Sequence, residues 1–330
     1  MSKRSQLIES IVETVADYRK GEIPSPTQDH VERWINQFEP TVQEPMLTEL
    51  DYVLQKTYIT KSTADGFLNE IVTNTKLAGD APCEFWEDIT FLDIQQGGNS
   101  QKEMLETFDG ILQEKCDLEI EDCESSSNIF FYLDDAIFTG NRVLNDLRGW
   151  IESDAPKDAQ VNIVVMAFHR GGQHYAKNNL KKTAKDSGKA IKFNWWRILE
   201  IEDRRIYTNS SDVLRPTTIP EDELVRKYVK MLEDKNFPPI LRRPGNVGEN
   251  KFFSSESGRN LLEQEFLKAG AKIRSKSPYL NVYQRPLGNM VLNTLGFGSL
   301  LVTYRNCPNN CPLAFWAGDP WYPLFQRKTN

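Results

Sequence analysis

The sequence has little of what marks membrane proteins, secreted proteins or broad nucleic-acid binders. Its 330 residues hold three histidines and five cysteines, and Lys and Arg (40) do not outnumber Asp and Glu (47), which leaves a net charge of -7. Because nucleic-acid affinity rests on clustered cations, this balance argues against a broad nucleic-acid surface. No apolar run approaches the ~20 residues of a membrane span, and the charged N-terminus lacks a signal-peptide core. We therefore expect a cytoplasmic protein with no membrane segment.

The cysteines are odd in number and scattered. In a cytoplasmic chain they are predicted to be reduced thiols. Cys307 and Cys311 stand three residues apart and have no second pair at zinc-ligand spacing, so zinc is not predicted. The segment NCPNNCPLAFW is instead predicted to be a turn that leads an apolar strand into the core. The five positions are Cys83, Cys116, Cys123, Cys307 and Cys311.

The pattern of apolar residues divides the chain into three predicted segments. Residues 1–80 hold four amphipathic stretches at helical spacing and form an N-terminal helical region. Residues 81–215 form an α/β core. Residues 216–330 form a C-terminal extension of helices and strands packed on that core, with GSLLVTYR (298–305) as a strand.

Four apolar runs with β character lie in the predicted core, at 89–94, 128–133, 162–168 and 192–201. Helical stretches separate them, and polar residues follow each of the first three runs. Continuous apolar strands that alternate with helices are typical of a parallel sheet covered on both faces. Ligands bind beyond the carboxyl ends of such strands, where these polar residues would meet.

The segment NIFFYLDDAIFTGNRV (128–143) carries the most chemical information. An apolar strand delivers Asp134 and Asp135, and Thr139 and Gly140 open a helix three residues later. The start of a helix has unpaired N–H groups and a dipole that favours anions, so this loop predicts a phosphate cradle. Ionised carboxylates accept hydrogen bonds from vicinal hydroxyls, which suits a ribose. The alternative is an ordinary helix cap with a tight turn.

These residues resemble the fingerprint of type I phosphoribosyltransferases. The resemblance implies a five-stranded parallel sheet, with Asp134 and Asp135 as catalytic residues at the ribose hydroxyls and as ligands of Mg²⁺. It implies that the loop and helix start surround the 5′-phosphate. The phosphate- and ribose-binding candidates are Ala136, Ile137, Phe138, Thr139, Gly140, Asn141 and Arg142.

The resemblance also places a pyrophosphate-binding loop after the first core strand. Gly97, Gly98, Asn99 and Ser100 occupy that place, and a plain strand-to-helix turn is the alternative. After the third strand, His169 and Arg170 are further pyrophosphate candidates, and the alternative is a solvated loop. The candidates for pyrophosphate binding are thus Gly97, Gly98, Asn99, Ser100, His169 and Arg170.

Two features depart from the family pattern. Arg142 stands where the family has a second hydroxyl residue, and the stretch KCDLEIEDCESSSN, in the place of a mobile cationic loop, has Lys115 as its only cation. An acidic stretch would repel a pyrophosphate unless Mg²⁺ intervened. These departures favour binding of a phosphoribosyl group or nucleotide over ordinary transfer from phosphoribosyl pyrophosphate.

The whole layout, with VERWINQF near the start and RNCPNNCPLAFW near the end, resembles the phosphoribosyltransferase-like domain of bacterial conflict systems, found near antiphage loci that include some retrons. The resemblance implies an antiviral effector that acts on a phosphorylated ribose or nucleotide by glycosyl transfer or N-glycosidic cleavage. It also implies a protein or ribonucleoprotein partner, such as a retron reverse transcriptase with its RNA. The alternatives are a catalytically inactive nucleotide-sensing regulator and a structural subunit.

Overall fold

The computed structural model describes residues 2–123 and 127–328, and its contacts group the chain into two compact units. Unit 1 combines Met1–Lys61 with Glu202–Asn330, and unit 2 is Ser62–Ile201. This grouping differs from the three consecutive segments predicted from the sequence, because the N-terminal helices find their apolar partners near the other end of the chain. Trp34, for example, packs edge-on against Phe266.

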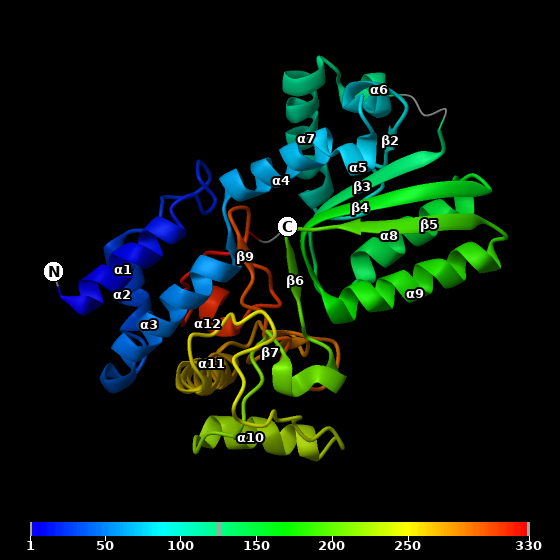
Figure 1. Ribbon diagram of the computed structural model, residues 1–330. Coiled ribbons are helices and arrows are strands. Elements are labelled where there is room, and N and C mark those ends of the chain that lie inside the picture. Colours follow the sequence, from blue (N-terminus) through cyan, green and yellow to red (C-terminus); the bar gives the residue numbers. More distant parts are fainter. Residues whose placement is uncertain (1, 124–126, 329–330) are drawn as a thin grey trace. The chain divides into compact units, whose positions relative to one another are not determined.

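Unit 2 is built on a five-stranded sheet in which every pairing is parallel (Figure 1). The strand order is β2-β3-β4-β5, and β6 pairs with β4 beyond the end of β5. The predicted α/β fold with a parallel sheet is confirmed. The elements are α4 (Lys61–Thr73), α5 (Thr75–Ala78), α6 (Pro82–Glu87), β2 (Thr90–Phe91), α7 (Ser100–Cys116), η1 (Ile120–Asp122), β3 (Ile129–Ile137), α8 (Asn141–Ser153), β4 (Asp158–His169), α9 (Arg170–Asp186), β5 (Ala190–Trp196) and β6 (Leu199–Ile201).

The strand boundaries depart from the sequence prediction in ways that matter for the site. The first predicted strand pairs only over Thr90–Phe91, and the predicted strand at 192–201 is two strands, β5 and β6. β3 does not end before the acidic pair but continues through it to Ile137, because the ladder with β4 extends to the pair Ile137↔Phe168.

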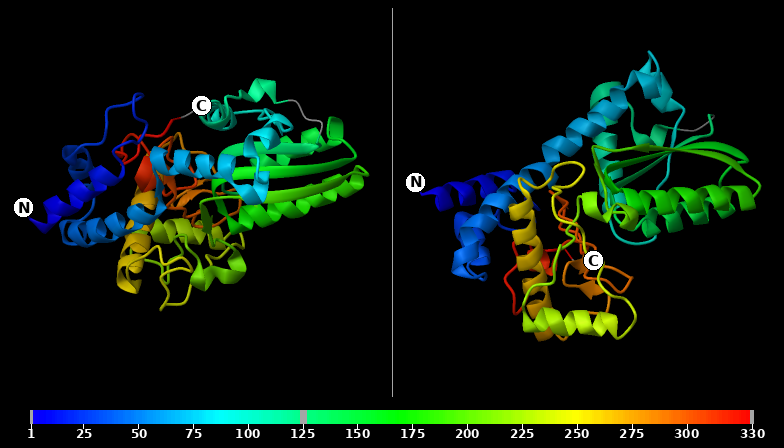
Figure 2. Two further views of the ribbon diagram at one scale, coloured as in Figure 1. Left: turned by 45° about the horizontal axis from the view of Figure 1, so that its top comes forward. Right: turned by 60° about the horizontal axis from the view of Figure 1, so that its bottom comes forward.

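Helices cover the sheet of unit 2. α8 and α9 lie on one face (Figure 2), where alternate β4 residues such as Ile163 and Val165 join their apolar side chains in one core. Neighbouring residues of a strand point to opposite faces. On β3, Phe131 accordingly contacts Trp86 of α6, and Trp86 contacts Phe108 of α7. The two-faced burial explains why the core strands read as continuous apolar runs.

The prediction that all five cysteines are reduced thiols is wrong for two of them. Cys83 of α6 and the last residue of α7, Cys116, form a disulfide across a sequence separation of 33 residues. No sequence pattern indicates this pair, because only the fold brings the two helix segments together. Cys123, Cys307 and Cys311 are buried free thiols.

Unit 1 is mainly helical and has an aromatic core. Trp34 of α2 contacts Phe38, Phe266 of α11 and Phe315 of α12. In the described part of the chain, no helix has the length and apolar character needed to cross a membrane. The elements of unit 1 are α1 (Lys3–Thr14), α2 (Gln28–Ile35), α3 (Pro40–Thr57), β1 (Tyr58–Ile59), η2 (Arg205–Ser210), α10 (Glu223–Glu233), α11 (Glu256–Lys276), β7 (Gln284–Arg285), β8 (Gly288–Asn289), β9 (Val302–Thr303) and α12 (Leu313–Trp316).

Two predictions for the end of the chain are wrong. The run 298–305 forms a strand only at β9, which pairs in parallel with β1. The segment after Cys311 enters the core as the short helix α12 rather than as a strand. Pro312 precedes this helix, and the fixed φ angle of proline suits a helix start.

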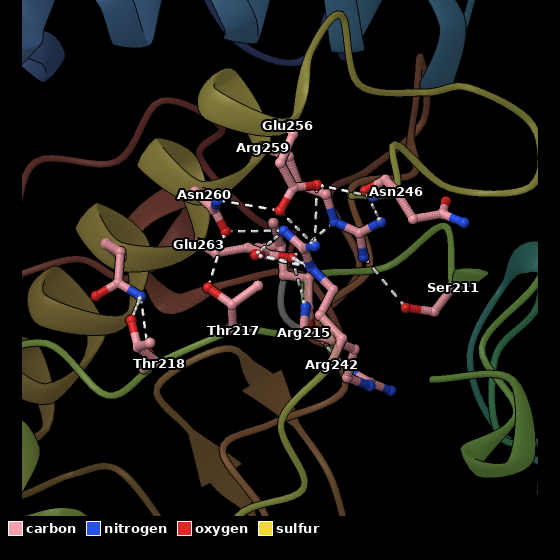
Figure 3. Close-up of polar contacts among 12 residues, drawn as sticks. Ser211, Arg215, Thr217, Thr218, Arg242, Asn246, Glu256, Arg259, Asn260 and Glu263 are labelled. Carbon is pink, nitrogen blue, oxygen red and sulfur yellow. Dashed lines mark hydrogen bonds and ion pairs between the residues drawn. The ribbon is translucent and has the colours of Figure 1, made fainter. Parts of the chain in front are cut away.

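A buried network of charged side chains holds the loop before α11 onto that helix (Figure 3). Arg242 bonds Glu263 at 2.9 Å, with both side chains fully buried, and bonds Glu256 at 2.8 Å. Arg259 approaches Glu263 at 2.8 Å from one turn away on the same helix. The backbone N–H of Arg215 also donates to Glu263, at 2.9 Å. Each buried carboxylate oxygen therefore has donors, as buried charge requires.

Candidate functional site

The acidic pair lies inside strand β3, and this separates its two carboxylates. Asp134 is buried, with 2% of its surface exposed, whereas Asp135 is half-buried. Because neighbouring strand residues point to opposite faces, the two side chains diverge instead of lying side by side. Asp135 is therefore the carboxylate that can reach a ligand from solvent.

Asp134 is satisfied from within the protein. It accepts a hydrogen bond from the N–H of Asp135 at 2.8 Å and another from the Ser100 hydroxyl. Burial raises the pKa of Asp134 to about 7, and the charge of Asp135 acts in the same direction, against the bond from Ser100 and the charge of Arg142. A carboxyl group in this position joins two chain segments.

Arg142 and Ser100 bring the two predicted ligand loops together. The Arg142 Nη1 donates to Ser100 Oγ at 3.1 Å, and a Cβ built on Gly98 would lie 3.1 Å from the same nitrogen. Ser100 therefore accepts from Arg142 and donates to Asp134. The structure brings the 97–100 segment and the start of α8 into one site, as the sequence predicted from their places at one sheet edge.

Three polar residues that the sequence analysis missed fix these loops. Gln101 is fully buried, and its Oε1 accepts the N–H groups of Ile94 and Gln95, both at 2.8 Å. Asp146 of α8 accepts from the Tyr132 hydroxyl at 2.9 Å. The one available signal in the sequence was a glutamine directly after a polar loop. Such a side chain can supply the hydrogen bonds that the backbone of the loop lacks.

The start of α8 has the form expected of an anion site. Gly140 occupies the N-cap position with φ +78°, and no described side chain caps the helix. The first N–H groups of a helix have no partners within the helix, so they remain for water or an anion. Thr139 is half-buried beside them. The candidate set from Ala136 to Arg142 runs from the end of β3 through the turn Phe138–Gly140 into the first residues of α8.

The turn rests directly on the backbone of α9. A Cβ on Gly140 would lie 2.2 Å from the carbonyl oxygen of Gly172, and a Cβ on Gly172 would lie 2.0 Å from the carbonyl oxygen of Phe138. Real Cβ atoms do not approach so closely, so both positions require glycine. This close backbone contact fixes the position of the turn against α9.

His169 and Arg170 take structural positions in this arrangement. His169 is fully buried, its Nδ1 lies 3.1 Å from the carbonyl oxygen of Ile137, and its ring packs on Phe138. Arg170 is not in a loop but begins α9, and it pairs with Glu200 at 2.5 Å. His169 thus supports the turn, and Arg170 ties α9 to β6.

Magnesium was expected at Asp134 and Asp135. Within residues 2–123 and 127–328, no three His, Cys, Asp or Glu side chains gather in a way that could hold a metal. Mg²⁺ commonly uses one or two carboxylates and completes its shell with water and phosphate oxygens. Asp135 fits that role and Asp134, satisfied by internal donors, does not. Part of the acidic stretch, residues 124–126, lies outside the described residues.

Comparison with known proteins assigns the fold to a family. The family model PRTase-CE matches residues 31–327. The chain belongs to the PRTase-CE family. PRTase-CE is a phosphoribosyltransferase-like domain, and the match covers both units. No curated protein and no solved structure matches the chain. The resemblance noted in the sequence to a phosphoribosyltransferase-like domain is thereby confirmed.

Proposed function

We propose that this PRTase-CE protein binds a phosphorylated ribose, free or as part of a nucleotide, at the turn between β3 and α8. The observation that carries the proposal is the glycine-capped start of α8, which offers unpaired N–H groups beside Asp135. The phosphate would bind at Thr139, Gly140 and the first residues of the helix. The carboxylate of Asp135 would accept hydrogen bonds from the ribose hydroxyls.

The reaction we propose is glycosyl transfer or N-glycosidic cleavage. Both pass through a transition state with positive charge on the sugar, so a carboxylate near the ribose gains value as that charge develops. Asp135 would supply this charge, and it would also hold a magnesium ion that neutralises ligand phosphates. The contacts among Asp134, Ser100 and Arg142 would hold the 97–100 segment against the start of α8. In the cell we propose the role of an antiviral effector with a protein or ribonucleoprotein partner.

A second function, ligand sensing without turnover, is favoured by a separate observation. The two carboxylates of the pair diverge, and Asp134 is buried and bonded within the protein. An enzyme that needed both carboxylates at the ribose would gain nothing from that placement. The same turn can bind phosphate tightly without any chemistry, in which case binding would regulate a partner protein.

One experiment separates these functions. The full chain is incubated with phosphoribosyl pyrophosphate and pooled nucleotides, with and without Mg²⁺, and products are read by mass spectrometry beside calorimetric binding. Product formation that is lost in Asp135→Asn supports the enzyme, and binding without product supports the sensor. Asp158→Asn, an exposed residue at the opposite end of β4, is the control. Failure to bind any of these ligands at millimolar concentration would refute both.

A further inference from the structure

Unit 1 contains a cavity of about 790 Å³ that is unrelated to the turn between β3 and α8. Its walls come from residues 18–30 and 277–327, so both ends of the chain build it. Five tyrosine and tryptophan side chains line it. They are Tyr18, Tyr279, Trp316, Trp321 and Tyr322. A volume of this size is within the range of small-molecule sites, which are about 300–1,000 Å³.

The aromatic walls have already used their polar groups. The indole N–H of Trp316 donates to the carbonyl of Cys311 at 2.8 Å, and that of Trp321 donates to the carbonyl of Ala314 at 3.0 Å. The Tyr18 hydroxyl donates to the carbonyl of Gln326 at 3.0 Å. These side chains therefore offer a ligand their ring faces and edges.

His30 is another wall whose polar atoms are occupied. Its Nε2 lies 2.7 Å from the carbonyl oxygen of Leu324, so Nε2 is the donor. Its Nδ1 then accepts from the hydroxyl of Tyr322, at 2.8 Å. Both ring nitrogens are held by the protein, and His30 leaves no donor for a ligand.

Arg327 also lines the cavity and is its one Lys or Arg residue among those described. Its guanidinium lies over the ring of Trp316, 5.6 Å from the centroid, and its Nε is buried with no hydrogen-bond partner in the described part of the chain. Burial lowers the pKa of Arg327, against the influence of Cys307 and Tyr18. A half-buried guanidinium with no carboxylate partner among residues 2–123 and 127–328 is costly, and an anion that reaches its other nitrogens from the cavity would reduce that cost.

We propose that this cavity binds a planar aromatic molecule that carries a phosphate or carboxylate, with Arg327 holding the anionic group and the aromatic walls stacking on the ring. Ring stacking and guanidinium binding of a planar anion are the two contacts these side chains favour. Asp319 also lines the cavity. It is exposed to solvent, where water and salt screen its repulsion of an anion.

The test uses the full chain and three probes: AMP, 2-aminobenzoate, and adenosine as an uncharged ring. The expected result is saturable binding of AMP or 2-aminobenzoate below 1 mM, read by calorimetry and tryptophan fluorescence, with adenosine at least tenfold weaker. Binding of AMP alone identifies phosphate as the group held, and binding of 2-aminobenzoate alone identifies carboxylate. Arg327→Met should weaken binding at least tenfold, and Arg327→Lys less.

Matched variants separate a site from a structural role. Arg327→Met removes a charge that has no carboxylate partner in the part of the chain that the structure describes, so the thermal midpoint should not fall. Arg226→Met changes an arginine with 64% of its side chain exposed, and binding should be unchanged. Tyr279, which is 92% exposed at the rim, can be replaced by alanine without disturbing the core, and Tyr279→Ala should weaken binding severalfold.

Three outcomes would overturn the proposal. The first is that neither charged probe binds below 1 mM. The second is that Arg327→Met binds as the unaltered protein does. The third is that Asp135→Asn abolishes the binding while Arg327→Met retains it. The probe would then bind at the turn between β3 and α8 in unit 2. Retained binding in Asp135→Asn supports the cavity and leaves the proposed function to its own experiment.

Discussion

The carbonyl oxygen of Gly172 lies 2.2 Å from the position that a Cβ on Gly140 would occupy. Two backbone segments thus meet with no room for a side chain between them. One is the turn between β3 and α8, and the other is the first turn of α9. The two glycines are distant in sequence and serve a single contact, so a change at either should move the turn.

Gly172→Ala tests this contact. Its Cβ would collide with the carbonyl oxygen of Phe138, 2.0 Å away, so the turn must shift. We expect a loss of about 1–3 kcal/mol in the free energy of unfolding, as for other overpacked sites, and at least tenfold weaker binding of phosphoribosyl pyrophosphate by calorimetry. Gly110→Ala in α7 is the control, because a Cβ there meets nothing within 4 Å, and it should stabilise by about 1 kcal/mol. A Gly172→Ala protein as stable and as active in binding as the parent would contradict the contact.

Glu49 gives unit 1 a pH dependence. This carboxylate is 2% exposed and accepts from the N–H of Ser254 at 2.8 Å. Burial raises its pKa above the ordinary value of 4.5, although the bonds from Ser254 lower it. Since the folded pKa exceeds the unfolded one, the stability it contributes is full below pH 4.5 and is lost as the pH rises through the folded pKa.

Glu49→Gln removes that loss. Relative to the parent, the variant should gain unfolding free energy between pH 4.5 and pH 8, measured by urea denaturation at both values. Glu44→Gln on the same helix is the control, since Glu44 is 47% exposed in its ion pair with Lys3. An equal difference between parent and Glu49→Gln at the two pH values would show that Glu49 does not titrate in this range.

The charge network of α11 predicts that a single substitution in it lowers the free energy of unfolding more than a suitable pair of substitutions does. Glu263→Leu leaves Arg242 and Arg259 buried without their shared partner (Figure 3), and should cost about 3–5 kcal/mol of unfolding free energy. Adding Arg242→Leu should restore part of this loss, because it removes a buried charge that has lost one of its two carboxylate partners. Urea denaturation measures both, and Glu223→Gln at an exposed pair should leave the midpoint unchanged. A double variant less stable than Glu263→Leu would mean that Arg242 contributes chiefly by packing.

The disulfide predicts a thiol count that changes on reduction. Alkylation of the denatured chain should label three cysteines without a reductant and five with one, as read by mass spectrometry. Closing a segment of 33 residues should stabilise the fold by roughly 3–4 kcal/mol on the chain-entropy model, so Cys83→Ser should lower the unfolding midpoint. Labelling of all five cysteines without a reductant would show that the two thiols are not bonded.

The sequence was sufficient for the parts of the fold that local pattern controls. Apolar spacing predicted the helices within residues 1–80, and the alternation of apolar runs with helices identified the parallel sheet. The helix start after the acidic strand was predicted correctly, because Thr139 and Gly140 follow that strand at a short, fixed distance. Each of these depends on neighbours within about fifteen residues.

The features that the sequence did not reveal depend on distant partners. Whether β3 stops before Asp134 or continues past it is decided by how far β4 extends alongside, and that length separates the two carboxylates. Arg170 begins α9 and pairs with Glu200, a residue thirty positions away in β6 that the local sequence around Arg170 does not reveal. The pairing of Cys83 with Cys116 and the contact between Asp134 and Ser100 likewise depend on how distant segments pack together.

The arrangement of unit 1 has a consequence for biosynthesis. β1 pairs with β9, so the partner of this early strand leaves the ribosome only after residues 62–201 have been made. Residues 62–201 emerge between them, so the sheet of unit 2 can assemble while the first helices still await their partners. During translation those helices expose the apolar side chains that later pack on α11 and α12, and a chaperone that shields them would raise the yield of native protein.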